Sequence, residues 1–145
     1  WMAGASLMVR HRTYEETGGF DERFFLYFEE TDLCLRARRA GWLSVYIPQS
    51  RVMHIGSVST GMKNWKRMPP FWFDSRLWYF TKNHGIFYAA MATTAYVAGA
   101  LIFKLRQVFG KRGNQPQHFL GDLVSHAFRC AWHRRLIGRA GGTAT

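Results

Sequence analysis

The sequence predicts an α/β chain whose first part alternates short strands with helices and whose second part is helical. Three observations support this prediction. Short apolar runs within residues 1–55 are bounded by Gly and Pro, which is typical of strands. Two segments in the same region have helical spacing and end at glycine. After residue 62, the apolar segments become too long for strands.

Three segments of the first part are expected to be strands. Residues 3–10 are a run of small and aliphatic residues that ends in a charged residue. Residues 42–48 alternate and close with a proline, and residues 51–55 form a second short run. Alternating apolar and β-branched side chains fit a partly buried strand.

Two helices are expected between these strands. Residues 12–17 form a short helical turn that ends at two glycines, where a positive φ angle costs little. Residues 30–40 place apolar side chains on one face and basic side chains on the other, and Gly41 ends the helix. Asp32 and Arg36 have the spacing and order of a favourable i, i+4 ion pair.

The second part of the chain is predicted to be helical. An aromatic-rich helix begins near Pro70, after a loop-like stretch. An uncharged run of 19 residues covers 85–103, and residues 118–136 are amphipathic with one basic face. We therefore divide the chain into residues 1–62, the α/β part, and residues 63–145, a helical extension.

Charge is distributed unevenly between these two parts. Residues 1–62 carry seven basic and seven acidic side chains, whereas residues 63–145 carry thirteen basic and two acidic ones. The net charge of +11 therefore comes entirely from the second part. This asymmetry indicates different roles for the two parts, and the basic one favours an anionic partner.

The uncharged run at 85–103 has about the length of a membrane-spanning helix. Its hydrophobicity is modest because Ala, Gly and Thr are frequent in it, and basic residues flank both of its ends. A single crossing prefers positive charge on one side, so a helix lying on an anionic membrane surface is favoured. The amphipathic segment at 118–136 also favours association with a membrane surface. A membrane-spanning helix and a soluble helical cap remain alternatives.

Composition indicates one globular domain or part of one. The 145 residues are 48% hydrophobic and 17% aromatic, which is enough to bury a core and excludes a disordered chain. Cys34 and Cys130 have no paired spacing, so neither a disulfide framework nor a zinc site is indicated, and a reducing cytosolic compartment fits best. No signal peptide is visible. Because the sequence opens with Trp1 inside an apolar run, we expect a fragment that continues upstream.

Three acidic residues, Glu29, Glu30 and Asp32, directly follow an aromatic run at residues 24–28. In a structural interpretation, acids in the first turn of a helix cap it and complement its dipole. In a functional interpretation, adjacent carboxylates and an aromatic wall raise a carboxyl pKa. Such a carboxylate can accept a proton from an alcohol during group transfer. The spacing alone leaves both interpretations open.

Several motifs in order resemble the C-terminal half of the catalytic domain of glycosyltransferase family 2, and within it the rhamnosyltransferase-like enzymes. These motifs are GGFDERFFLYFEETDLCLRARRAGW at residues 18–42, YIPQSRVMH at 46–54, HIGSVST at 54–60 and SRLWYFTKNHG at 75–85. The resemblance covers roughly residues 1–84. It implies a GT-A fold, an α/β sandwich around a mostly parallel sheet, and favours the catalytic interpretation of the acidic cluster.

The resemblance implies that Glu30, the second position of the acid-acid-x-Asp motif, is the catalytic base. Many relatives have Asp at this position. Because Glu30 departs from that pattern, a neighbouring acid is the alternative group that takes the proton. Residues implied to bind substrate lie around it: Gly19, Phe20, Asp21, Glu22, Glu29 and Asp32. In the structural alternative, the glycines only end a helix and Phe20 only packs in the core.

A divalent cation, Mg²⁺ or Mn²⁺, is implied for the leaving nucleoside diphosphate. By resemblance His54 is its ligand, although a histidine that only closes a strand is the alternative. Gly56, Ser57 and Ser59 would form a loop over the site. The sequence contains no DxD motif, which is where relatives hold the cation. We therefore expect the chain by itself to be inactive.

The implied function is inverting transfer of a sugar such as rhamnose from a nucleotide-diphosphate sugar to a glycan or polyprenyl-linked acceptor. The implied location is the cytoplasmic face of a bacterial cell membrane, where cell-surface polysaccharide is built. Two rival hypotheses are a basic, aromatic-rich nucleic-acid-binding module and a non-catalytic, membrane-associated remnant. The neutral first part and the lack of a nucleic-acid-binding motif argue against nucleic acid as a partner.

Overall fold

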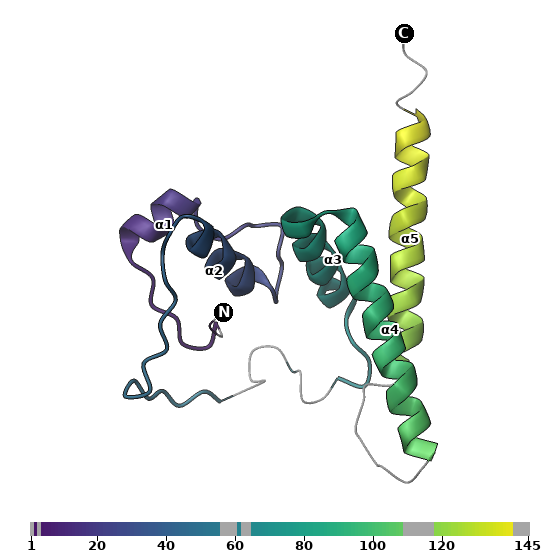
Figure 1. The fold of residues 1–145 in the computed structure, drawn as a ribbon, viewed down its shortest axis with the longest axis horizontal. Helices are drawn as coiled ribbons and strands as arrows, with labels where there is room; N and C mark the ends of the chain where they lie inside the picture. Colours follow the sequence, from purple (N-terminus) through teal and green to yellow (C-terminus); the bar gives the residue numbers. More distant parts are fainter. Residues whose placement is uncertain (1, 3, 56–60, 62–64, 109–117, 141–145) are drawn as a thin grey trace.

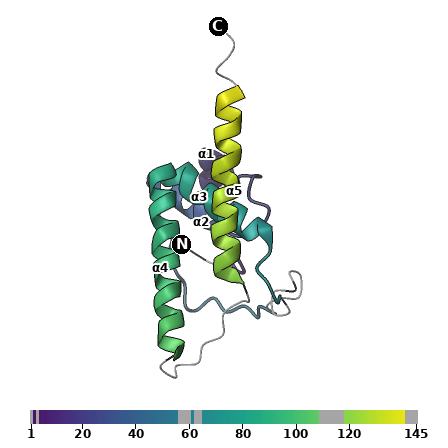
Figure 2. The same cartoon turned by 90° about the vertical axis from the view of Figure 1, so that its right-hand side faces the viewer.

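The computed structural model describes residues 2, 4–55, 61, 65–108 and 118–140. These residues form five helices: α1 (His11–Thr17), α2 (Glu29–Arg39), α3 (Pro70–His84), α4 (Ile86–Val108) and α5 (Phe119–Ala140). Helices α1 and α2 lie to one side of α3, and α4 and α5 lie to the other (Figure 1). Helices α4 and α5 pack side by side and run in opposite directions (Figure 2).

The helix boundaries confirm the predictions made from glycine and proline. Helix α1 ends at Gly18 and α2 ends just before Gly41, and these glycines have φ angles of 74° and 88°. Helix α3 begins with Pro70 and ends at Gly85, whose φ angle is 85°. Glycine adopts such angles without steric cost, and proline is favoured in the first helical turn, where its missing N–H is not needed.

The predicted strands at 3–10, 42–48 and 51–55 are wrong for the part of the chain that the structure describes, which contains no β-strand. Residues 42–55 are instead extended or turn-like and expose apolar side chains, with Leu43 at 87% and Met53 at 91% exposure. A strand needs a neighbouring strand to satisfy its N–H and C=O groups. The apolar pattern is present here, but no described segment pairs with it.

The main core lies where α3, α4 and α5 meet. Phe73 of α3 packs with Phe119 and Leu123 of α5, and all three are at least 95% buried. Trp72 and Val97 cover this cluster. Because Phe119 and Leu123 are separated by one helical turn, the buried face of α5 is the apolar face that the sequence predicted.

Helix α4 packs with small residues and exposes large ones. Ala89 and Ala100 are buried, whereas Phe87, Met91 and Leu105 are more than 60% exposed. Residues 86–107 have the length and composition of a membrane-crossing helix, with a mean hydropathy of 1.7 in a window that is only 11% buried. An exposed apolar surface of this kind indicates an apolar partner, either a membrane or another protein.

The predicted boundary between residues 62 and 63 falls at positions that the structure does not describe, as does the predicted loop containing Gly56, Ser57 and Ser59. Helix α3, although it belongs to the second part, packs directly on α2 of the first. This contact brings the acidic cluster next to residues of the basic part.

Candidate functional site

The acidic cluster occupies the first turn of α2, which starts from unusual backbone geometry. Tyr27 and Phe28, which precede the helix, have φ angles of 69° and 71°, and no side chain caps the helix. For residues other than glycine, this left-handed region costs about 1–2 kcal/mol each. Strain of this kind is common at functional sites, where the surrounding packing enforces it.

Aromatic packing against α3 enforces this geometry. The Tyr27 ring stacks on Phe71, with 6.4 Å between ring centroids, and Phe28 contacts Trp72 and Tyr79 at 5.9 and 5.6 Å. Aromatic pairs at such separations add about 0.5–1.5 kcal/mol each beyond their buried area. The aromatic run before α2 therefore fixes where α2 starts, and with it the direction of the first acidic side chains.

Glu29 and Glu30 line a cavity of about 520 Å³ at the start of α2. The other side chains that line it are apolar or aromatic, from Leu7, Val9, Tyr14 and Phe20, and Gly4 completes the wall. The Oε2 atoms of both glutamates are buried and have no hydrogen-bond partner among the described residues. A buried acceptor without a partner costs about 1–3 kcal/mol. Both carboxyl groups thus keep acceptor capacity that the described residues do not use.

The environment of Glu29 favours its protonated form. Burial raises the pKa of Glu29, and although its own backbone N–H lowers that pKa, the neighbouring charge of Glu30 raises it further. A carboxylate whose pKa is raised toward neutrality is a stronger proton acceptor. Of the two adjacent glutamates, Glu29 therefore has the raised pKa that suits general-base chemistry, and Glu30 shares its cavity.

Asp32 has a different environment from the two glutamates. Its fully buried carboxylate accepts hydrogen bonds from Arg36 Nε (2.7 Å), Lys82 Nζ (2.8 Å) and Asn83 Nδ2 (2.8 Å). Burial alone would raise the pKa of Asp32, but these hydrogen bonds outweigh it and hold the pKa below its usual value. The predicted Asp32–Arg36 pair is confirmed, and Asp32 joins α2 to α3 without lining the cavity.

Asp21 also binds α3. Its Oδ2 atom accepts hydrogen bonds from Trp78 Nε1 (3.0 Å) and Lys82 Nζ (2.9 Å), and its Oδ1 atom accepts one from the backbone N–H of Arg23. Burial by itself would raise the pKa of Asp21, but these hydrogen bonds lower it to about 2. Lys82 therefore bridges Asp21 and Asp32, and the Asp21 carboxylate is already used within the protein.

Gly19, just after α1, helps to hold the cavity wall in place. Gly19 is buried with a φ angle of 70°, and a Cβ atom there would lie 2.8 Å from the Tyr14 ring. Its carbonyl accepts a hydrogen bond from Arg36 Nη2 at 2.7 Å, and the Thr17 carbonyl accepts one from Nη1. Arg36 thus ties the end of α1 to α2, which positions Tyr14 and Phe20 beside the glutamates.

The structure brings together only some of the residues that the sequence analysis singled out. Phe20, Glu29 and Glu30 line one cavity, whereas Asp21 and Asp32 face α3 and the side chain of Glu22 is exposed.

His54 lies on the exposed extended segment and belongs to no group of three His, Cys, Asp or Glu ligands among the described residues.

Four residues with a role here were missed: Tyr14, Trp78, Lys82 and Asn83. The last three lie within the motif SRLWYFTKNHG, where a lysine and an asparagine interrupt an otherwise aromatic helix.

Comparison with known proteins confirms the resemblance to rhamnosyltransferases. The chain is 49% identical over 61 residues, 42% of its length, to N-acetylglucosaminyl-diphospho-decaprenol L-rhamnosyltransferase of Mycobacterium tuberculosis (strains CDC 1551 / Oshkosh and ATCC 25618 / H37Rv). It is 39% identical over 54 residues, 37% of its length, to Rhamnosyltransferase WbbL of Escherichia coli (strain K12). The matched region spans about 20% of the length of each relative. No family model and no solved structure matches the chain.

Proposed function

We propose that this chain, which is homologous to rhamnosyltransferases over its matched region, is the acceptor-binding and base-carrying part of a GT-A-type glycosyltransferase. The single observation that carries the proposal is the pair of glutamates, Glu29 and Glu30, which line one cavity and keep buried oxygens that no described residue hydrogen-bonds. Residues that only cap a helix have no need of a cavity. A sugar hydroxyl would supply the missing hydrogen-bond donor.

In the proposed reaction, Glu30 accepts the proton of an acceptor hydroxyl as its oxygen attacks the anomeric carbon of the donor sugar. The bond from that carbon to the nucleoside diphosphate breaks, so the sugar is transferred with inversion. Glu29 lines the same cavity beside the base, and its buried oxygen is a second acceptor for a sugar hydroxyl. Phe20 and Tyr14, whose rings pack edge to face at 6.0 Å, form an apolar wall against which a sugar ring packs.

The divalent cation implied for such a reaction has no complete set of ligands near this cavity among the described residues. His54 by itself is one exposed ligand. A chelation experiment on the active enzyme would test whether a cation is needed.

The proposed acceptor is a lipid-linked sugar, and the proposed location is the cytoplasmic membrane surface. The name of the M. tuberculosis relative specifies an N-acetylglucosaminyl-diphospho-decaprenol acceptor. Helix α4 supports this proposal because its large apolar side chains are exposed and the second part of the chain is strongly basic. A helix held at the membrane would keep the cavity close to a lipid-borne hydroxyl.

The decisive experiment is a chimaera in which this chain replaces the matched segment of the M. tuberculosis rhamnosyltransferase. We expect the chimaera to transfer rhamnose, and Glu30→Gln to lower kcat by about 10²–10⁴-fold, the usual contribution of a general base. The control is Glu15→Gln, which makes the same chemical change on an exposed side chain of α1 outside the cavity. If Glu30→Gln turned over as fast as the control, Glu30 would be ruled out as the base. If only Glu29→Gln lost that much kcat, the role of the base would belong to Glu29.

A further inference from the structure

A second cluster of reactive side chains lies on the opposite side of α3 from the glutamates. Asp74 of α3 faces His126 and Cys130 of α5, and the three ligand atoms all lie within 4.8 Å of one another. His126 Nε2 is 2.7 Å from Asp74 Oδ1 and 3.7 Å from Cys130 Sγ. His126 and Cys130 are one helical turn apart, so their side chains project from the same face of α5.

One of these separations is that of a tetrahedral zinc site, and a second is somewhat shorter. With Zn–S near 2.3 Å and Zn–N near 2.0–2.1 Å, two such ligands on one ion lie roughly 3.6 Å apart. The observed His126–Cys130 separation of 3.7 Å matches this value. The Asp74–His126 hydrogen bond must open by roughly 0.7 Å to admit the ion, because ligand N and O atoms on zinc lie roughly 3.4 Å apart.

We propose that Asp74, His126 and Cys130 form a binding site for a divalent transition-metal ion, Zn²⁺ in the first place, that fastens α3 to α5. The ligand set is chemically suitable because carboxylate, imidazole and thiolate are the three ligand types that Zn²⁺ takes from proteins. One thiolate and one carboxylate neutralise the charge of a dication. This inference is independent of the proposed sugar transfer.

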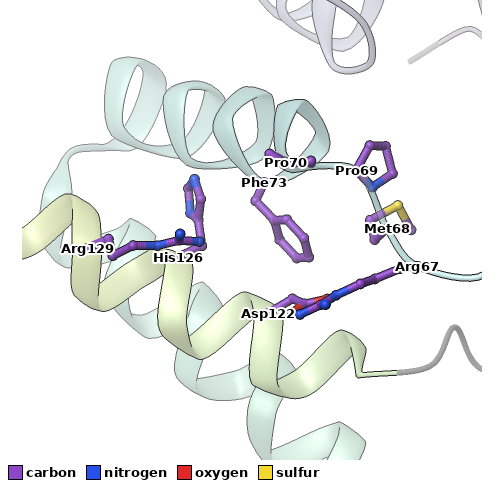
Figure 3. A pocket seen from close by; sticks show the side chains of 8 residues that line it. All are labelled: Arg67, Met68, Pro69, Pro70, Phe73, Asp122, His126 and Arg129. Carbon is purple, nitrogen blue, oxygen red and sulfur yellow. Dashed lines mark hydrogen bonds and ion pairs between the residues drawn. The ribbon is translucent and has the colours of Figure 1, made fainter.

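The surroundings leave room for a fourth ligand and for entry of the ion. His126 lines a cavity of about 370 Å³ between α3 and α5, together with Met68, Phe73 and Arg129 (Figure 3). The Asp74 side chain is 65% exposed, whereas the His126 side chain is 10% exposed. A buried imidazole with an exposed carboxylate beside it gives the ion a path from solvent, and a water molecule from the cavity side can complete the tetrahedron.

The His126 ring is also held in a fixed orientation. It lies 5.7 Å from the ring of Phe73, which belongs to the buried core between α3 and α5. Near this site Arg67 is neutralised by Asp122, with Arg67 Nε 2.6 Å from Oδ2, and Figure 3 shows the two side chains meeting below the Phe73 ring. A rigid imidazole lowers the entropy cost of metal binding.

The test is titration of the full chain, reduced and metal-free, with Co²⁺ and then Zn²⁺. We expect one ion per chain and a near-ultraviolet thiolate-to-cobalt charge-transfer band that Zn²⁺ removes. Cys130→Ser should abolish the band and weaken Zn²⁺ binding by at least about tenfold, because even indirect supports of a metal ligand are worth 10–100-fold. Cys34→Ser is the matched control, since Cys34 lies on α2 outside the cluster, and it should change neither quantity.

Asp74→Asn provides a second variant that should fold normally, because Asp74 is on the surface. It should weaken Zn²⁺ binding while far-ultraviolet circular dichroism shows the helices intact. Zn²⁺ should also raise Tm relative to a chelator in the wild type and not in Cys130→Ser. The proposal would be overturned if the chain did not bind one ion per molecule. It would also be overturned if Cys130→Ser and Asp74→Asn left Zn²⁺ binding unchanged.

Discussion

The contact of α3 with the segment between α1 and α2 can be tested by removing one charge, with the substitution Asp21→Asn. The Asp21 carboxylate accepts hydrogen bonds from Trp78 and Lys82 of α3. Asparagine keeps the size of the side chain and one acceptor oxygen but removes the negative charge. Lys82 retains its second partner, Asp32, so the substitution isolates the charge of Asp21.

The magnitude follows from the pKa of Asp21. Burial alone would raise this pKa, but the hydrogen bonds from Lys82 and Trp78 lower it from 3.8 to about 2. Since one pKa unit corresponds to about 1.4 kcal/mol, the charged form contributes roughly 2 kcal/mol to the free energy of unfolding. The Asp21 side chain is 20% exposed, so solvent screening reduces this to about 1–2 kcal/mol. A lowered pKa stabilises the fold above the unfolded-state value, and the contribution is lost as pH falls from about 4 to about 2.

The assay is urea unfolding of the wild type and Asp21→Asn, followed by tryptophan fluorescence and circular dichroism. We expect the wild type to be more stable by about 1–2 kcal/mol near pH 7, and the difference to vanish as pH approaches about 2. Glu22→Gln, on an exposed neighbour, should stay within about 0.5 kcal/mol of the wild type. A difference that does not depend on pH, or an equal effect of Glu22→Gln, would refute the role assigned to Asp21.

Three further predictions concern the cavity wall, the core and the membrane surface. Gly19→Ala should lower the free energy of unfolding by about 1–2 kcal/mol, measured by urea unfolding, because the φ angle is 70° and the new Cβ would meet the Tyr14 ring. Leu123→Ala should cost about 2–5 kcal/mol in the same assay, because it leaves a cavity in the α3–α5 core. Leu101→Glu on the exposed face of α4 should weaken binding to anionic lipid vesicles by about tenfold or more in a sedimentation assay, because burial of a leucine contributes about 1.5–3 kcal/mol.

Each of these substitutions has a matched control in the chain. Gly18→Ala introduces the same strain at a φ angle of 74° but meets no atom within 4 Å, so it should cost less than Gly19→Ala. Phe128 is 72% exposed, and Phe128→Ala should change stability by less than about 0.5 kcal/mol. Ser125→Glu adds the same charge to an exposed position of α5 and should affect vesicle binding less than Leu101→Glu. If a substitution and its control had equal effects, the physical reason given for that substitution would be wrong.

Local signals in the sequence were sufficient to predict the helices of this protein. Gly18, Gly41 and Gly85 mark helix ends because only glycine tolerates their backbone angles cheaply, and Pro70 marks the start of α3. The Asp32–Arg36 pair was predictable for the same reason, since four residues of helix always bring such side chains together. The acidic motif and its resemblance to rhamnosyltransferases were also visible without coordinates.

Strand formation was not predictable from the apolar pattern at residues 42–55, because a strand depends on a partner that is distant in sequence or absent from the described residues. Contacts with residues distant in sequence also explain why the three acids of the cluster have different environments. Glu29, Glu30 and Asp32 are equivalent in sequence, yet Lys82 and Asn83 of α3 bind Asp32 alone and leave the glutamates beside a cavity.

The sequence by itself therefore determined which segments are helical and which carboxylates are candidates for chemistry, because both depend on residues within a few positions of one another. Only the tertiary structure decided which carboxylate is structural, which ones line the cavity, and that Asp74 meets His126 and Cys130. Those outcomes depend on contacts between helices that are some fifty residues apart in the chain, such as Asp32 with Lys82 and Asp74 with His126. No local pattern encodes such a contact, because it is set by how the apolar faces of the helices pack.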